Sequence, residues 1–236
     1  MTETIPVYVG WDPRQDIAYQ VCRHSLLARA SWPVTVSPLT QDHLRATGFY
    51  WRDEDPLAST AFTYTRFLVP TVAGFEDWAL FCDSDFLWLG DVAELWALRD
   101  PRYAVMCVQH DYRPPETLKM DGRLQTRYPR KNWSSLMLVN CGHPANGPLT
   151  AVMANRESGR FLHRFKWLDD SLIGALPEKW NWLEGWCAKP QVGTPRAIHY
   201  TRGGPWFADW QDVDYAEDWF DEERRYRDTL PATHIA

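Results

Sequence analysis

Two aspartates, Asp83 and Asp85, interrupt the stretch ALFCDSDFLWLGD (79–91), which is otherwise apolar enough for a buried strand. An ionised carboxylate in an apolar interior is unfavourable unless a positive group compensates it. Side chains two residues apart on a strand point to the same face, so both carboxylates would project together where the strand ends. Ligands of open α/β sheets bind outside the carboxyl ends of the strands, and Mg²⁺ or Mn²⁺ there takes carboxylates together with substrate phosphates. The spacing therefore indicates a divalent cation site; the alternative is a solvated pair in a tight turn.

A later stretch, IHYTRGGPW (198–206), combines a histidine, an arginine and two glycines. His199 follows a strand-like approach, and a neutral imidazole beside two carboxylates shifts the metal preference from Mg²⁺ towards Mn²⁺. Gly203 and Gly204 predict a flexible turn that would bring backbone N–H groups and the Arg202 guanidinium close to an anion. The alternative for His199 is a structural histidine whose hydrogen bonds are satisfied within the fold.

These residues need a scaffold, and the apolar periodicity of the chain predicts an α/β one. Residues 5–10 and 34–39 are short apolar runs typical of strands, and 15–30 carries one apolar helical face. A β-α-β unit of this kind opens a domain with a parallel sheet. We expect one domain over residues 1–236, with a mainly parallel central sheet flanked by helices. Further strands are expected at 79–82, 103–108, 136–140 and 196–200, and helical segments at 59–72, within 147–180 and in the acidic, aromatic tail from about 209.

Composition narrows the class of partner. The net charge is −6, and no block of lysine or arginine is dense enough to follow a phosphate backbone, so nucleic acid is not expected as a partner. The first residues lack the features of a secretory signal, and no apolar run approaches the roughly 20 residues that span a bilayer. The five cysteines form no C-x-x-C pair, which is typical of reduced, buried thiols in a cytoplasmic protein.

Five stretches, in the right order, resemble the retaining family 8 glycosyltransferases of the GT-A (Rossmann-like) fold, which are related to glycogenin and the bacterial lipooligosaccharide galactosyltransferases. FCDSDFLWLGDVAELW is similar to the family's metal-binding D-x-D with its downstream D-x-x-x-L-W. NWSSLMLVN is similar to its N-x-G-h-h-h-x-N strand, and IHYTRGGPW to its H-Y-x-G-x-x-K-P-W ending. The resemblance extends from residue 7 to about residue 206 and implies the GT-A fold. The stretches are YVGWDPRQDIAYQVCRHSL, FTYTRFLVP, FCDSDFLWLGDVAELW, NWSSLMLVN and IHYTRGGPW.

Carried over residue by residue, the resemblance implies a donor site. Asp83, Asp85 and His199 correspond to the ligands of Mn²⁺ (or Mg²⁺). Asp12 corresponds to a residue that contacts the base, and Arg66 to one that reaches the nucleotide-sugar. The implied activity is transfer of a hexose from a nucleotide-sugar, with UDP as the family's usual nucleotide, to a glycan, a lipid-linked or another hydroxyl acceptor, with retention of anomeric configuration. The donor sugar, the acceptor and the oligomeric state stay open at this level.

The stretch LDDSLIGALPEKWNW is similar to the family's D-Q-D-x-L-N…L-P-x-x-W-N segment. It implies that Asp169 and Asp170 lie beside the transferred sugar, where Asp170 would stabilise the oxocarbenium-like carbon or attack it. A front-face route and a covalent intermediate both stay open. The alternative for the pair is a helix N-terminus, where the dipole favours acidic residues.

The sequence departs from the family's pattern at three places. Asp170 stands where Gln is more frequent, and Ser135 stands where Gly is usual. The lysine that touches the diphosphate is absent, and Arg202 would replace it as a planar fork matched to phosphate oxygens, with Gly203 and Gly204 adding backbone donors. These departures allow for a changed acceptor or nucleotide.

Aromatic residues near these motifs are candidates for an acceptor site. Trp180, Trp182 and Trp186, together with the polar loop at 110–132, would stack on an acceptor sugar. The chain has fourteen tryptophans, and a tryptophan-rich core explains the same residues equally well.

Two other classes of protein fit part of the pattern. Haloacid-dehalogenase-like phosphatases also have D-x-D after an apolar strand, but theirs is an early strand, whereas a β-α-β unit precedes Asp83 here. A non-catalytic carbohydrate-binding domain would explain the tryptophans, but it would not need the D-x-D, the late histidine and the arginine together.

Overall fold

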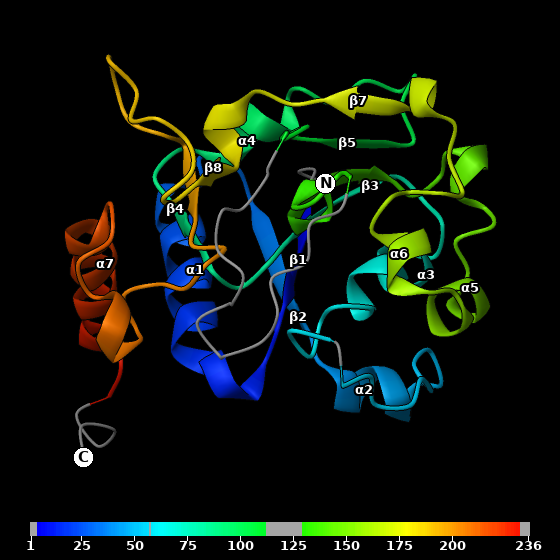
Figure 1. The fold of residues 1–236 in the computed structure, drawn as a ribbon, viewed down its shortest axis with the longest axis horizontal. Coiled ribbons are helices and arrows are strands. Elements are labelled where there is room, and N and C mark those ends of the chain that lie inside the picture. The colour runs from blue at the N-terminus through cyan, green and yellow to red at the C-terminus, as the bar shows by residue number, and fades with distance from the viewer. Residues whose placement is uncertain (1–3, 57, 112–128, 232–236) are drawn as a thin grey trace.

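The computed structural model describes residues 4–56, 58–111 and 129–231. A six-stranded sheet has the order β2-β1-β3-β6-β5-β7 (Figure 1). β1 pairs with β2 and β3 in parallel, β5 pairs with β7 in parallel, and β6 runs antiparallel to both β3 and β5. The expected mainly parallel sheet is therefore confirmed. Its strands are β1 (Ile5–Gly10), β2 (Val34–Leu39), β3 (Trp78–Cys82), β5 (Val105–Cys107), β6 (Leu136–Asn140) and β7 (Ile173–Ala175).

A second, three-stranded sheet lies beside the first and has the order β4-β9-β8. β4 (Phe86–Trp88) pairs antiparallel with β9 (Ala197–His199), and β8 (Trp182–Leu183) pairs with β9 in parallel. The late strand β9 was expected, whereas β4 and β8 were not. The β4–β9 pairing joins the D-x-D region to the late histidine.

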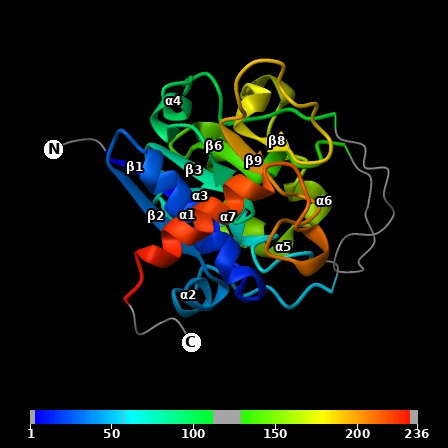
Figure 2. The ribbon, with the colours of Figure 1, turned by 90° about the vertical axis from the view of Figure 1, so that its left-hand side faces the viewer.

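Helices cover both faces of the six-stranded sheet. α1 (Asp16–Arg29), which was expected from its apolar face, packs on the side where α7 (Ala216–Asp228) lies outermost (Figures 1 and 2). The buried Glu222 of α7 forms ion pairs with His24 and Arg29 of α1, at 2.6 and 2.8 Å. Since the buried Trp219 packs in the same contact, the helix expected in the tail is docked on α1.

The remaining helices are short. α2 (Gln41–Ala46), α3 (Val69–Val72), α5 (Ala151–Arg156) and α6 (Gly159–Leu162) lie on the other side of the sheet from α1, and α4 (Val92–Trp96) follows β4 (Figure 1). Seven 3₁₀ helices occur among the described residues, at Pro13–Gln15, Thr65–Leu68, Trp133–Ser135, Pro144–Asn146, Asp170–Leu172, Glu178–Trp180 and Ala208–Trp210.

Two expected helical segments are corrected by the structure. Residues 59–72 form turns, then the 3₁₀ helix Thr65–Leu68 and then α3, because Pro70 lacks an N–H and is compatible only with the first turn of a helix. The segment 147–180 contains helices as expected, namely α5, α6 and two 3₁₀ helices, but it also contains the unexpected strand β7. All five cysteines are free, as expected, and four of them are buried. Among the described residues no helix combines the length and the apolar character that a membrane crossing requires.

Candidate metal centre

The side chains of Asp83, Asp85 and His199 converge where β3 ends. Asp83 directly follows β3, Asp85 directly precedes β4, and His199 ends β9, where it faces Phe86 in the β4–β9 register. One ligand atom of each side chain lies within 4.8 Å of the others. The imidazole stacks on the Phe86 ring, with the ring centroids 4.5 Å apart. The three residues predicted as ligands are therefore close enough to share one cation.

The two carboxylates have buried oxygens that lack hydrogen bonds. Neither Asp83 Oδ1 nor Asp85 Oδ1 has a hydrogen-bond partner within the described structure, although Arg66 Nη1 approaches Asp83 Oδ1 to 2.8 Å as an ion pair without hydrogen-bond geometry. Burial raises the pKa of Asp83 to about 7; Arg66 opposes this rise and the neighbouring Asp85 adds to it. For Asp85, burial also acts to raise the pKa, but the nearby His199 outweighs it and the pKa is lowered. Two crowded carboxylates with unused lone pairs, beside an imidazole, fit the ligand preferences of a divalent cation.

Arg66 is part of this cluster. It lies in the 3₁₀ helix Thr65–Leu68 and is buried, with its guanidinium 5.3 Å from the ring centroids of both Phe62 and Phe81. Its Nη1 also donates to the carbonyl of Ser134 at 2.9 Å. The contact of Arg66 with a nucleotide-sugar stays a prediction. The structure gives Arg66 a second role, because its guanidinium balances the buried charge of Asp83.

Asn181 is a residue that the sequence analysis did not single out. It is fully buried, and its Oδ1 lies 3.0 Å from His199 Nδ1 while its Nδ2 donates to Ser135 Oγ at 2.9 Å. A carbonyl oxygen at Nδ1 holds the proton there and leaves Nε2, which lies 3.4 Å from Asp85 Oδ1, as the atom facing the carboxylates. The departure at Ser135 is thereby explained, since its hydroxyl accepts from Asn181. The sequence signal that could have pointed to Asn181 is its position as a polar residue between two tryptophans, in WNW.

Asp12 lies at the same edge of the sheet, because it follows β1 and β1 is parallel to β3. Its carboxylate accepts hydrogen bonds from the backbone of Arg14 at 3.0 Å and of Ala61 at 2.9 Å, and from the Arg14 side chain. Burial acts to raise its pKa, but these hydrogen bonds outweigh burial and lower it. Asp12 therefore holds the loop after β1 to residue 61, and its contact with a base stays a prediction.

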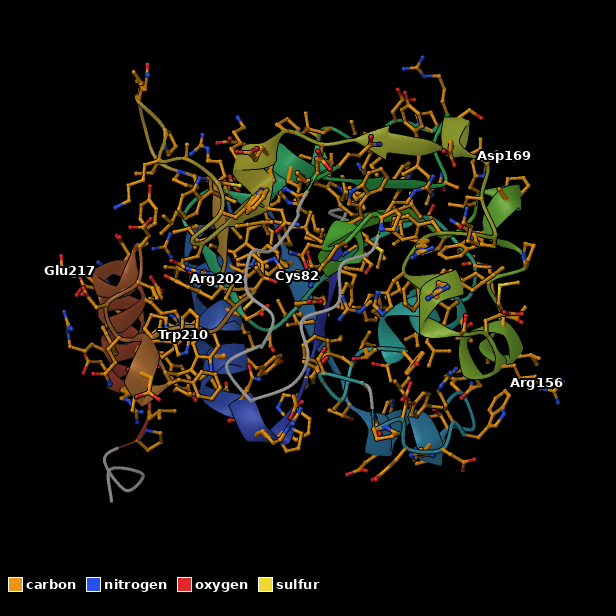
Figure 3. The ribbon with its side chains drawn as sticks, viewed as in Figure 1. Cys82, Arg156, Asp169, Arg202, Trp210 and Glu217 are labelled. Atoms are coloured by element: carbon orange, nitrogen blue, oxygen red, sulfur yellow. The ribbon has the colours of Figure 1, made fainter. Side chains whose placement is uncertain are left out.

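The predicted anion-binding turn is present, but its arginine is engaged. Arg202 Nη2 donates to the buried carboxylate of Glu184 at 3.0 Å, and its guanidinium lies 5.3 Å from the Trp210 ring (Figure 3). Gly203 has φ 142, a left-handed conformation that favours glycine. A Cβ on Gly204 would lie 2.0 Å from the Trp206 ring, so only glycine fits. The contacts of Arg202, Gly203 and Gly204 with a diphosphate stay predictions.

Asp169 and Asp170 are not brought to the cluster. Both precede β7, which is parallel to β5 and, through β6, to β3, so they lie at the opposite end of the sheet from Asp83. The Asp170 side chain is 84% exposed and pairs with Arg130. Figure 3 shows Asp169 far from both Cys82 and Arg202. The sequence resemblance implied a placement of this pair beside the sugar. Here Asp170 begins the 3₁₀ helix Asp170–Leu172, which leads into β7 from the opposite end of the sheet, so this position gives the catalytic role no support.

The tryptophans proposed for acceptor stacking divide into two groups. Trp180 and Trp182 are 1% and 2% exposed, so their rings belong to the core and the stacking role predicted for them is wrong. Trp186 is 40% exposed and keeps that prediction. Of the loop expected at 110–132, residues 112–128 lie outside the described residues.

Comparison with known proteins identifies a relative. Protein CDI of Arabidopsis thaliana is 52% identical over 223 residues, a match that covers 93% of this chain and 86% of that protein. The chain belongs to the Protein CDI family. No family model matches it. The name of this relative states no activity, so membership of the family alone assigns none to this chain.

The fold has clear counterparts among solved structures. The bifunctional glycosyltransferase WbbM aligns with a TM-score of 0.67 at 16% identity, over 97% of this chain and 52% of that one. GlyE of Streptococcus pneumoniae aligns with a TM-score of 0.61 at 15% identity, over 93% of this chain and 60% of that one. The galactosyltransferase LgtC aligns with a TM-score of 0.60 at 13% identity, over 97% of this chain and 98% of that one. The chain thus has the GT-A glycosyltransferase fold and spans about half of the WbbM chain.

Proposed function

We propose that this protein is a metal-dependent glycosyltransferase that moves a hexose from a nucleotide-sugar, with UDP as the nucleotide, to a glycan, a lipid-linked or another hydroxyl acceptor. The observation that carries the proposal is the convergence of Asp83, Asp85 and His199 at the carboxyl end of β3. In a sheet of this kind ligands bind at that edge. The GT-A fold supports the same class of reaction but does not decide it, since one fold serves many functions.

Asp83, Asp85 and His199 would hold Mn²⁺ or Mg²⁺, and such an ion, when bound, would stabilise the negative charge of a departing nucleoside diphosphate. The protein's part is to fix these ligands beforehand. Asn181 sets the proton of His199 on Nδ1, and Arg66 compensates the charge of Asp83. Because these supports are buried, the ligands need little rearrangement when the donor binds.

Retention of the anomeric configuration is the finer part of the proposal and rests on the sequence resemblance. Asp170 pairs with Arg130 at the other end of the sheet, so we give it no part as a nucleophile. A front-face route, in which the acceptor hydroxyl enters on the side from which the diphosphate leaves, fits this arrangement. A cytoplasmic location is also proposed, because five free thiols suit a reducing compartment.

Calorimetry with UDP-hexoses tests the proposal. Wild-type protein is expected to bind a UDP-hexose in Mn²⁺ and not in EDTA, and Asp85→Asn to lose more than about 100-fold in affinity, beyond the effect of removing an outer-shell partner. Asp100→Asn is the matched control, because Asp100 pairs with Arg102 on the surface. Equal binding in Mn²⁺ and in EDTA would contradict the metal-dependent reaction.

The two rival classes predict other outcomes. The D-x-D of this chain follows the third strand of the sequence, not an early one, and the GT-A fold does not favour the phosphatase. A non-catalytic carbohydrate-binding domain would bind glycans without affinity for any nucleotide. A thermal-shift screen of nucleotide-sugars with and without Mn²⁺ separates it from the enzyme, because only a ligand of the folded state raises the melting temperature.

A further inference from the structure

A second group of metal-binding side chains lies beyond the candidate metal centre. His110 lies three residues beyond β5, Glu178 begins the 3₁₀ helix Glu178–Trp180, and Cys187 lies four residues beyond β8. One ligand atom of each lies within 4.8 Å of the others. Three separate segments thus bring a nitrogen, an oxygen and a sulfur donor to one place.

His110 has a buried nitrogen that needs a partner. The residue is 8% exposed, and its Nε2 has no hydrogen-bond partner within the described structure. The imidazole forms a hydrogen bond with the backbone of Asn181, and Trp133 Nε1 donates to the His110 carbonyl at 2.9 Å, so the residue is held in place. A buried polar atom left without a hydrogen-bond partner destabilises the folded state. A bound ligand at Nε2 would remove this destabilisation.

The other two groups suit a metal ion. Cys187 is the partly exposed cysteine, and its Sγ accepts from the Leu183 N–H at 3.4 Å. Burial and the neighbouring Glu178 carboxylate raise the pKa of the Cys187 thiol to about 12, so a metal has to displace the thiol proton when it binds. Glu178 is exposed and its carboxylate accepts a hydrogen bond from the Cys187 thiol, and its side chain can rotate to adopt the position that a metal requires. The His110 imidazole is held in place, whereas the Glu178 carboxylate can move towards it and towards the Cys187 sulfur. The three ligand atoms can therefore come close enough together to bind one metal ion.

We propose that His110, Glu178 and Cys187 form a second metal site, selective for a transition metal of the Zn²⁺ type. Zn²⁺ binds thiolate, imidazole and carboxylate in tetrahedral geometry, and three protein ligands leave one position for water or another ligand. On binding, the Cys187 thiol gives its proton to water as the sulfur–metal bond forms, and no redox change is involved. Sulfur is a poor ligand for Mg²⁺, so this site and the carboxylate centre would select different ions.

The two sites are neighbours. Asn181 bonds to the His110 ring through its backbone and to His199 through its side chain. A metal at the second site would thus tie the segment 178–187 to the end of β5, directly beside the candidate metal centre. The proposal stands on its own ligands and does not require the glycosyltransferase function.

Titration of the metal-free full-length protein with Co²⁺ tests the second site. A thiolate–Co²⁺ charge-transfer band is expected in the near ultraviolet, with tetrahedral visible bands that Zn²⁺ abolishes by displacement. Cys187→Ser is expected to lose the charge-transfer band and one equivalent of bound Co²⁺, and His110→Gln to weaken Co²⁺ binding at this site by more than tenfold. Cys141→Ser, which removes a buried thiol elsewhere, is the matched control and should keep the band.

Two results would overturn the proposal: folded wild-type protein that gives no charge-transfer band, or a band that persists unchanged in Cys187→Ser. Asp85→Asn should keep the band while it loses Mn²⁺-dependent nucleotide binding, and Cys187→Ser should do the reverse. Failure of the glycosyltransferase proposal would therefore leave the Co²⁺ result intact. Circular dichroism of each variant establishes that the comparison is between folded proteins.

Discussion

The Nε2 atom of His199 lies 3.4 Å from Oδ1 of Asp85, across the antiparallel pair β4–β9. The pairing of one short strand after the D-x-D with one late strand is thus what completes the candidate centre.

The first prediction concerns the imidazole ligand. His199→Ala should lower Mn²⁺ affinity by more than about 100-fold, because it removes the nitrogen donor and leaves two carboxylates in a buried site. Isothermal titration with Mn²⁺ measures the loss. His43→Ala, which removes an exposed histidine, is the control and should bind as wild type. Unchanged Mn²⁺ affinity in His199→Ala would exclude this residue as a ligand.

The second prediction concerns Asn181, which acts through His199. Asn181→Ala should weaken Mn²⁺ binding by about 10–100-fold, the usual effect of removing an outer-shell partner. Asn181→Asp keeps an oxygen acceptor for Nδ1–H, so it should recover part of that loss. A purely structural role for Asn181 would instead lower the melting temperature in both variants and leave the Mn²⁺ affinity of the folded protein untouched.

A third prediction follows from the 2.8 Å ion pair between Arg66 and Asp83. Arg66→Gln should destabilise the metal-free protein by up to about 3 kcal/mol at pH 9 and much less at pH 7, because the pKa of Asp83 is about 7 and its carboxylate needs the compensating charge only where it is ionised. The double variant Arg66→Gln/Asp83→Asn should recover most of this stability, since no uncompensated charge remains. Urea unfolding of the four proteins gives the coupling energy; simple additivity of the two single effects is the result that would refute the pairing.

The fourth prediction is a pH dependence in the contact between α1 and α7. Burial acts to raise the pKa of Glu222, but hydrogen bonds from Arg29 and His24 outweigh it and hold the pKa below its ordinary value of 4.5. Glu222 therefore contributes stability above pH 4.5, and the contribution is lost as the pH falls through the lower folded-state pKa. Glu222→Gln should cost about 2 kcal/mol at pH 7.

The stability difference between Glu222→Gln and wild type should then shrink towards zero in acid. Thermal unfolding at a series of pH values measures it. Glu223→Gln, on the same helix but with its partner Arg227 in solvent, serves as the control and should change little. A difference that stays constant down to pH 3 would argue against an ionised Glu222 as the docking group.

Much of the scaffold was predictable from periodic patterns. The β-α-β unit of β1, α1 and β2, the strand β3 before Asp83 and the strand β6 all have apolar runs long enough to be recognised. The short strands β4, β7 and β8 were not predicted, because tertiary pairing sets their positions, although β5 and β9, which are equally short, were expected from the apolar stretches around them. The interruption of the helix expected at 59–72 has a visible cause in the sequence, because Pro70 can occupy only the first turn of a helix.

The candidate site, like the fold, was predictable only in part. Asp83, Asp85 and His199 were singled out from residue type and spacing, and the structure brings them together. Asp170 was placed by motif alignment alone, which fixes order along the chain but not the direction in which the next strand runs. The ion pair between Arg202 and Glu184 was not predictable either, because nothing in the local sequence connects these two residues.

The position of β9 also makes cation binding dependent on the second sheet. Without the β4–β9 pair, the chain holds two acidic groups with no imidazole beside them, so the three-ligand site is incomplete. A cation bound by all three side chains would therefore report that β9 has paired with β4.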